Sequence, residues 1–127
     1  MPTILDRHTV VHLGTDLSLA PLPVGPDFWE HAAGQPELDD GRILSVVGYD
    51  ATWTWRERHP VGDELALVLR GAVVLELEEG AASRRMALEA GQCGIIPAGA
   101  WHRAVMERPC RLLFVTPTPA RTEQRTA

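Results

Sequence analysis

Residues 91–102 read Gly91-Gln-Cys-Gly-Ile-Ile-Pro97-Ala-Gly99-Ala-Trp-His102, and this stretch decides the fold. A short apolar run, typical of a strand, leads into Pro97-Ala-Gly99. Proline presets φ and glycine tolerates positive φ, so these residues specify a tight turn. A return strand then begins near His102. Its two-residue period places three side chains on one face: His102, Ala104 and Met106.

The upstream residues 53–71 add polar groups to this arrangement. They read Trp53-Thr-Trp-Arg-Glu-Arg-His-Pro-Val-Gly-Asp-Glu-Leu-Ala-Leu-Val-Leu-Arg-Gly71. Alternation along the first strand places four side chains on one face: Trp53, Trp55, Glu57 and His59. A Pro-Val-Gly-Asp turn follows, and Glu64 begins the next strand. We therefore expect a histidine and two carboxylates to converge at one end of a sheet.

From residue 41 onward, short segments rich in β-branched and aromatic residues are separated by Gly, Pro and Asp. No window there sustains a helical period for the ten or so residues that a helix needs. Many short strands with closely spaced turn signals predict an all-β sandwich or barrel with antiparallel pairing. We expect this barrel to span residues 41–117.

The two ends of the chain have a different character. Residues 1–40 are expected to form a strand over Thr3–Leu13 and then a wrapping arm rich in Pro and Gly, with a short helix possible near Asp27–His31. Residues 118–127 show no apolar periodicity, and we expect a flexible tail.

Length and composition argue against several classes of protein. A chain of 127 residues, 45% hydrophobic and 23% charged, has the size and composition of one globular domain. Its net charge of -5 argues against a nucleic-acid partner. No apolar run approaches the roughly 20 residues that span a bilayer, and no secretory signal is evident, so we expect no membrane partner and a cytoplasmic location. Cys93 and Cys110 are expected to be free, mostly buried thiols.

Taken together, the two stretches resemble the cupin superfamily. The later cupin motif, Gly-x5-Pro-x-Gly-x2-His, is matched at all four positions: Gly91, Pro97, Gly99 and His102. The earlier motif, His-x-His-x3–4-Glu-x6-Gly, is matched by His59, Glu64 and Gly71, but Glu57 replaces its first histidine. Met106 stands where the family often has Asn. The resemblance covers residues 41–117 and implies a double-stranded β-helix, or jelly-roll, barrel.

In cupins these positions bind one metal ion inside the barrel, which implies that His59, Glu64 and His102 are ligands. Glu57 is either a fourth ligand or a carboxylate that holds a water or an imidazole. The candidate ions are iron, manganese, nickel and zinc, and the two carboxylates shift the preference toward manganese or iron. A cation would also relieve the repulsion between two carboxylates in an apolar interior. The alternative is a vestigial site that keeps the barrel and has lost the metal.

The sequence leaves the reaction open. Our leading hypothesis is a metal-dependent enzyme that acts on a small organic molecule, either a dioxygenase or an isomerase or decarboxylase in which a free Glu57 is the catalytic base. The alternatives are a non-catalytic module that binds a small ligand or a metal, and a metal-free dimer scaffold. Trp53 and Trp55 are either barrel packing or pocket walls, and Met106 is expected to be a gap-filling core residue that makes the pocket less polar.

Several other residues have side chains of possible functional interest but belong to no recognised motif: His8, His12, His31, Trp101, Glu76, Glu78 and Glu79. We expect His8 and His12 at the surface or on an edge strand, since they lack the zinc-protease pattern. The three glutamates are expected on a solvated strand and hairpin, and Trp101 on the barrel exterior.

Cupins commonly form dimers, and we expect a homodimer. The apolar strands Val73–Leu77 and Leu112–Val115, together with the N-terminal arm, are consistent with that expectation, because sheet edges need covering.

Overall fold

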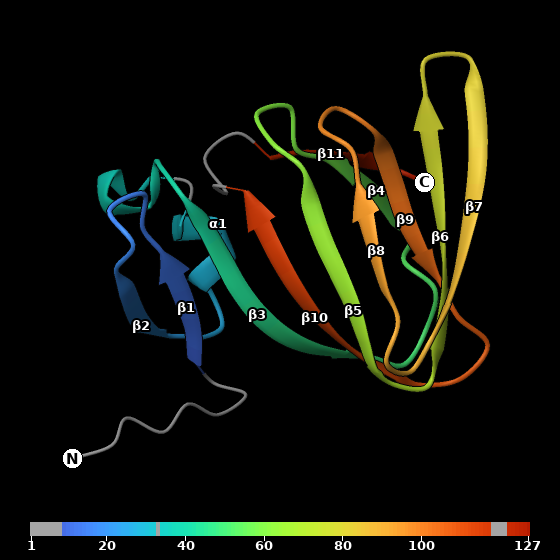
Figure 1. The fold of residues 1–127 in the computed structure, drawn as a ribbon, viewed down its shortest axis with the longest axis horizontal. Helices are drawn as coiled ribbons and strands as arrows, with labels where there is room; N and C mark the ends of the chain where they lie inside the picture. Colours follow the sequence, from blue (N-terminus) through green and yellow to red (C-terminus); the bar gives the residue numbers. More distant parts are fainter. Residues whose placement is uncertain (1–8, 33, 118–121) are drawn as a thin grey trace.

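The chain folds into two antiparallel β-sheets that enclose one main core (Figure 1). The computed structural model describes residues 9–32, 34–117 and 122–127. Along the chain the elements are β1 (Thr9–Leu13), β2 (Leu19–Pro23), α1 (Phe28–Ala32), a 3-10 turn (Pro36–Leu38), β3 (Arg42–Tyr49), β4 (Trp55–Arg58), β5 (Glu64–Arg70), β6 (Ala72–Glu79), β7 (Ala82–Glu89), β8 (Cys93–Ile96), β9 (Trp101–Val105), β10 (Cys110–Pro117) and β11 (Glu123–Thr126). The prediction of an all-β jelly-roll barrel is confirmed.

Each of the two motif stretches passes from one sheet to the other. The larger sheet has the order β2-β1-β3-β10-β5-β8, and the smaller has the order β11-β4-β9-β6-β7. The earlier stretch supplies β4 and β5, the later stretch supplies β8 and β9, and β5 pairs with β8 while β4 pairs with β9. The two stretches therefore lie beside each other in both sheets, which brings their polar residues to one region of the interior.

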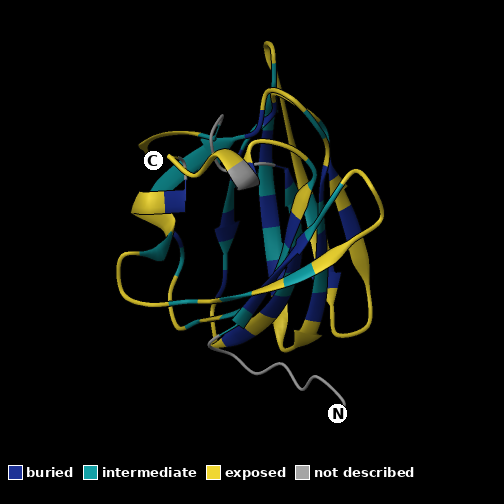
Figure 2. Cartoon of the chain, turned by 90° about the vertical axis from the view of Figure 1, so that its left-hand side faces the viewer, coloured by how far each residue is buried: buried dark blue, intermediate teal, exposed yellow. Residues whose placement is uncertain are grey.

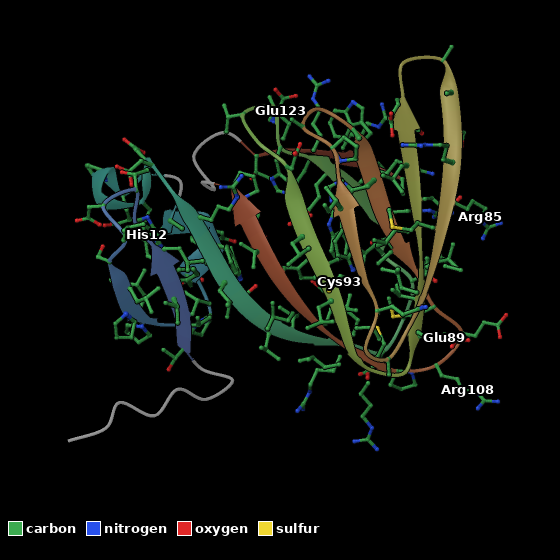
Figure 3. The ribbon with its side chains drawn as sticks, in the orientation of Figure 1. His12, Arg85, Glu89, Cys93, Arg108 and Glu123 are labelled. Atoms are coloured by element: carbon green, nitrogen blue, oxygen red, sulfur yellow. The ribbon has the colours of Figure 1, made fainter. Side chains whose placement is uncertain are left out.

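The core between the sheets follows from the two-residue period of the strands. In β6, Val73, Leu75 and Leu77 are buried, and Val74 and Glu76 between them are less buried and lie on the opposite face. Figure 2 shows this alternation of buried and less buried positions along the strands, and Figure 3 shows exposed charged side chains such as Arg85 and Arg108 pointing away from the sheets. Each fully buried Leu or Val contributes roughly 1.5–3 kcal/mol, so this alternation fixes which face of each strand turns inward.

The N-terminal arm extends the larger sheet and adds a small second core. β1 pairs with β3 on one side and with β2 on the other. The second core consists of Val10, Ala32, Leu38 and Ile43, so α1 and the following turn pack against this part of the sheet. The strand expected over Thr3–Leu13 is observed from residue 9, and residues 1–8, which include His8, lie outside the described part. α1 lies where the short helix was expected, and no described helix is long and apolar enough to cross a membrane.

The expectation of a tail without regular structure is wrong for the last residues. Glu123–Thr126 form β11, which pairs antiparallel with β4 at the edge of the smaller sheet. Both faces of β11 are polar, so apolar periodicity gave no signal. Residues 118–121 lie outside the described part of the chain.

Two single residues also differ from expectation. His12 is buried at 8% exposure, because β1 is an inner strand, and its Nε2 lies 2.8 Å from the backbone oxygen of Asp40. Cys93 is exposed rather than buried, because its position on β8 faces outward, whereas Cys110 is buried; both thiols are free, as predicted.

Candidate metal centre

The four candidate ligands come from three strands and one strand end. Glu57 lies on β4 and stands directly opposite His102 on β9. His59 follows the end of β4, and Glu64 begins β5 in the other sheet. Period-two alternation therefore turns Glu57, His59 and His102 toward the interior from one sheet, and the crossing between the sheets brings Glu64 to face them.

Backbone contacts lock the two motif stretches together beside these residues. The Pro97–Gly99 turn is closed by the Ala100 amide, which donates to the carbonyl of Pro97 over 3.1 Å. Gly99 has the positive φ of 80° that the sequence pattern requires, and its amide donates to the carbonyl of His59 over 3.0 Å. The two histidines are thus held at a fixed separation by the turn between them.

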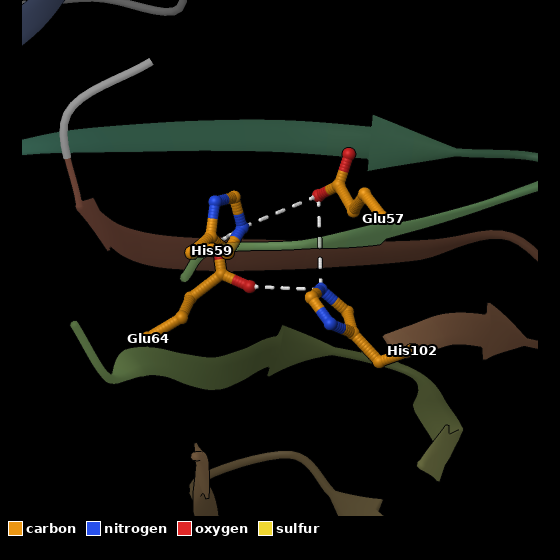
Figure 4. Close-up of side chains that lie close together, drawn as sticks. All are labelled: Glu57, His59, Glu64 and His102. Carbon is orange, nitrogen blue, oxygen red and sulfur yellow. Dashed lines mark ion pairs between the residues drawn. The ribbon is translucent and has the colours of Figure 1, made fainter. Parts of the chain in front are cut away.

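The side chains of the four residues meet at one point (Figure 4). One potential ligand atom from each lies within 4.8 Å of all the others. Glu64 is the nearest partner of both imidazoles, with Oε1 3.1 Å from Nε2 of His102 and Oε2 3.3 Å from Nε2 of His59. Glu57 Oε1 stands 3.7 Å from the Nε2 atoms of both histidines.

Neighbouring groups orient these side chains from behind. His102 Nδ1 donates to the carbonyl of Ala100 over 3.0 Å, since a carbonyl can only accept, and this turns Nε2 toward the centre. Nδ1 of His59 lies 2.9 Å from the hydroxyl of Thr122. Glu64 Oε2 accepts a 2.6 Å hydrogen bond from Thr116.

Three atoms at the centre are buried and make no hydrogen bond within the described structure: Nε2 of His59, Nε2 of His102 and Oε1 of Glu64. They face one another as ion pairs, with Nε2 of His102 3.1 Å from Oε1 of Glu64, so either protons on the imidazoles or a cation between them must balance the carboxylate charge. Imidazole nitrogens and carboxylate oxygens are competent donors for a divalent first-row metal. The residues present therefore fit a metal ion.

The charges at the centre are strongly coupled. Burial would lower the pKa of both imidazoles, but the two facing glutamates outweigh it and raise the pKa of His59 to about 9 and that of His102 to about 10. Burial would raise the pKa of Glu57, but the two histidines lower it to about 2, and they lower the pKa of Glu64 as well. Both carboxylates are therefore ionised at neutral pH and attract positive charge, whether protons or a metal ion.

A cavity of about 500 Å³ adjoins the centre. It is lined by Glu57, His59 and Glu64 and by a set of largely aromatic side chains: Trp29, Tyr49, Trp53, Trp55 and Phe114. Trp53 and Trp55 stack with ring centroids 4.8 Å apart and planes within 10° of parallel. The centre therefore opens onto a space with flat apolar walls, large enough for a small organic molecule.

Met106 lies in the main core, as expected of a gap-filling residue, and it is not among the residues that line the cavity. It is 8% exposed, and its sulfur accepts a hydrogen bond from the thiol of Cys110. It shares a strand face with His102, but four residues of strand separate them by roughly 13 Å, which removes Met106 from the centre.

Sequence reasoning missed several residues of the site. Thr116 follows Leu112 and Phe114 at two-residue spacing, so alternation along that strand could have identified it as inward-facing. Thr122 and Gln124 also line the cavity but carry no apolar pattern. Trp29 reaches the cavity from α1, in the arm that the sequence described only loosely.

The remaining chemistry-bearing residues lie away from the centre. His31 is exposed near the end of α1. Glu76 pairs with Arg103 on the outer face of the smaller sheet, and Glu78 and Glu79 pair with other arginines. Trp101 lies on the same outer face, next to the guanidinium groups of Arg58 and Arg125.

Comparison with known proteins points to one family. The sequence profile described as Cupin domain matches residues 45–116, more than half of the chain. No curated protein matches the chain in a sequence search.

Solved structures share the fold at low sequence identity. A cupin-2 domain containing protein from Shewanella frigidimarina is 21% identical with a TM-score of 0.52, and the match covers 60% of this chain and 70% of that one. An oxalate decarboxylase from Lactobacillus farciminis is 20% identical with a TM-score of 0.56, and the match covers 67% of this chain and 26% of that one. A hydroquinone 1,2-dioxygenase from Sphingomonas is 18% identical with a TM-score of 0.50, and the match covers 60% of this chain and 59% of that one. At these identities the likeness shows the fold and leaves the reaction open.

Proposed function

Because the chain belongs to the cupin domain family, we propose that it binds one divalent metal ion and acts as an enzyme on a small organic molecule. The ligands in this proposal are His59, Glu64 and His102, and Glu57 is either a fourth ligand or the catalytic base. The observation that carries the proposal is the convergence of buried imidazole and carboxylate donor atoms, three of which make no hydrogen bond in the described structure, on one point beside an aromatic-walled cavity. A filled core with its polar atoms hydrogen-bonded would show neither these atoms nor the cavity.

The donor set favours manganese or iron. Two carboxylates and two imidazoles form a harder set than three imidazoles and a carboxylate, and harder donors suit these two ions. Nickel and zinc compete for the same donors, so selection depends also on which ion is available.

A bound metal would supply Lewis acidity and a template for the substrate. The protein's own groups set the rest of the chemistry. Glu57 is the most accessible of the four, with a side chain 17% exposed, and its Oε2 has only a long 3.4 Å contact with the amide of Gln124. Glu57 is therefore the group best placed to take a proton from a molecule in the cavity, as an isomerase or decarboxylase requires. In a dioxygenase it would instead remain a fourth ligand.

The cavity walls suit a flat or apolar substrate portion. The parallel pair of Trp53 and Trp55 offers a broad aromatic surface, and Phe114 and Tyr49 add to it. Ser45 and Thr116 add hydroxyl groups to the lining of the cavity. These groups support binding of a molecule that has both an apolar body and a polar group directed at the metal.

The rival function is a non-catalytic module that binds a metal or a small ligand. A module that only holds a metal differs from an enzyme or a ligand-binding module in that its metal keeps no position that a small molecule can take. Loading with Mn²⁺ and measuring the relaxation rate of water protons separates them, because a metal with exchangeable water accelerates that relaxation. We expect strong enhancement, and a metal that is bound without enhancement would make the site structural.

The reaction type is then tested with the Fe²⁺-loaded protein and a panel of small hydroxylated and carboxylated compounds. Oxygen consumption that matches substrate loss identifies a dioxygenase. Substrate loss without oxygen consumption identifies an isomerase or decarboxylase. No turnover of any compound, together with tight ligand binding, would favour the non-catalytic module.

A further inference from the structure

We infer that the C-terminal strand β11, together with Thr122 directly before it, positions His59 and Glu57 for metal binding. This inference rests on the proposed function, since it concerns the same four ligands. The strand lies beyond residues 45–116, the part that matches the family profile. It is therefore a feature of this chain that the family motifs do not contain.

Thr122 and β11 contact Glu57 on β4 and His59 just after β4. The hydroxyl of Thr122 lies 2.9 Å from Nδ1 of His59, and the amide of Gln124 donates to Oε2 of Glu57 over 3.4 Å. Thr122 and Gln124 also line the cavity. The side chain of His59 is only 4% exposed, so water is a poor substitute for the hydroxyl as a partner for Nδ1. Replacing the hydroxyl would leave a buried ring nitrogen unpaired and the ring free to turn.

The two histidines differ in how they are oriented. His102 is held by the carbonyl of Ala100, two residues away on its own segment. His59 has no such local partner within the described residues, and its Nδ1 contact comes from a residue 63 positions later. One half of the centre is therefore preorganised by the motif turn, and the other half depends on the C-terminal strand.

The opposite face of β11 holds the strand in place. Period two turns Glu123 and Arg125 away from Thr122 and Gln124. Glu123 accepts from Arg58, with Nη2 2.7 Å from Oε2, and Arg125 pairs with Glu78 on β6. The guanidinium groups of Arg58 and Arg125 lie 4.8 Å and 4.4 Å from the ring centroid of Trp101.

These outer contacts explain why a short, wholly polar strand stays paired at a sheet edge. The four β11 positions pair in register with β4, and the Ala127 amide adds a hydrogen bond to the carbonyl of Thr54. The ion pairs and cation–π contacts lie across the neighbouring strands β4, β9 and β6, so they tie the strand to the sheet rather than to the ligands.

The test compares three single variants of the full chain. Thr122→Val removes the hydroxyl at nearly constant volume, Thr122→Ser keeps it, and Thr126→Val makes the same change four residues later, in β11, at a residue outside the cavity lining. Metal affinity is measured by competition with a chelating dye, using Mn²⁺ and Co²⁺ alone. We expect Thr122→Val to lower the affinity about 10–100-fold, Thr122→Ser to stay within about threefold, and Thr126→Val to match the wild type.

The absorption spectrum of the Co²⁺-loaded protein gives a readout that mere destabilisation would not move. Its visible bands report ligand geometry, and we expect them to shift in Thr122→Val and not in Thr126→Val. Thermal melting of the metal-free forms shows whether each variant folds; should Thr122→Val not fold, Thr122→Ala replaces it.

Equal affinity and identical spectra in Thr122→Val and the wild type would overturn the inference. A wild-type protein that binds no metal would instead overturn the proposed function itself, so the two failures are distinguishable.

Discussion

At the scale of single residues, the four ligands are held with unequal firmness. His102 is fully buried and anchored to a backbone carbonyl, and Glu64 is 2% exposed and anchored by Thr116. Glu57 is more accessible and stands 3.7 Å from both histidines, farther than Glu64 does. This ranking suggests that Glu64 carries more of the metal affinity and that Glu57 is freer to take part in chemistry.

The two glutamates should therefore respond differently to the same substitution. We expect Glu64→Gln to weaken metal binding by at least about a hundredfold, or roughly 2.8 kcal/mol, and Glu57→Gln to weaken it by about tenfold or less. Isothermal titration with Mn²⁺ measures both. A larger loss in Glu57→Gln than in Glu64→Gln would reverse the ranking.

Metal affinity should rise with pH. The pKa values of His59 and His102 in the metal-free protein, about 9 and about 10, lie above the ordinary value of 6.5, so protons compete with the metal for Nε2 at neutral pH. Binding must release these protons, and the apparent affinity should increase up to about tenfold per pH unit for each proton displaced between pH 6 and 9. Titrations at four pH values in matched ionic strength test this, and a flat profile would contradict it.

The residues that could be predicted from the sequence are those with a two-residue period or a motif spacing. Glu57 and His59 share a strand face, and the turn at Pro97–Gly99 fixes where His102 begins the next strand. Thr122 and Gln124 could not be predicted, because their role depends on a pairing between segments more than 60 positions apart. Alternation placed Met106 on the same strand face as His102. Alternation predicts which side chains share a face, but it does not predict how far each one lies from the metal centre.

At the scale of elements, the connections between the sheets decide whether the ligands meet. Gly71 joins β5 of the larger sheet to β6 of the smaller and has a φ of 82°. A Cβ added there would lie 2.9 Å from the backbone oxygen of Pro109, which belongs to the loop before β10. The last glycine of the earlier motif is thus needed both for its backbone angle and for the close approach of another segment.

Gly71→Ala should consequently cost more than the backbone angle alone explains. Gly80, in the β6–β7 hairpin, also has a positive φ, but a Cβ there would meet nothing within 4 Å. We expect Gly80→Ala to lower the free energy of unfolding by about 1–2 kcal/mol from the left-handed conformation, and Gly71→Ala by roughly 1–3 kcal/mol more because of the added clash. Urea denaturation of the metal-free proteins measures both, and equal losses would contradict the role given to Pro109.

The elements themselves were predictable to different degrees. A strand whose faces differ in polarity, such as β6, is evident from alternation alone. β11 is polar on both faces and is stabilised by ion pairs with strands that lie far away in the sequence, so the local sequence carries no signal for it. The sequence also did not predict which sheet each strand joins, because a turn between two strands does not show whether those strands pair with each other.

At the scale of the whole molecule, the larger sheet has an apolar outer face. Two rows run across β3, β10, β5 and β8 in register, formed by Leu44, Val115, Leu65 and Ile95 and by Val46, Leu113, Leu67 and Cys93. All are partly or fully exposed. Val73, Leu75 and Leu77 lie in the core, so the segment Val73–Leu77, which the sequence also suggested, contributes little to such a surface.

The cytoplasmic location of the protein stays a prediction.

We propose that this outer face pairs with the same face of a second copy. A two-fold interface must be self-complementary, and an uncharged apolar face meets that condition even though the chain carries a net charge of -5. Light scattering coupled to gel filtration should give twice the chain mass of 13.9 kDa. Ile95→Arg should give the monomer, whereas Val61→Arg, at an exposed apolar residue outside the two rows, should not. A monomeric wild type would end this proposal.

The most direct test of the account is the metal content of the purified protein. Wild type and His102→Ala are each dialysed against Mn²⁺ or Fe²⁺ and freed of excess ion by gel filtration. Their metal content is then measured by inductively coupled plasma mass spectrometry. We predict close to one metal ion per chain in the wild type and almost none in His102→Ala, with far-ultraviolet circular dichroism showing that both are folded. Equal metal content in the two folded proteins, whether high or negligible, would contradict the claim that these four side chains converge in order to bind a metal.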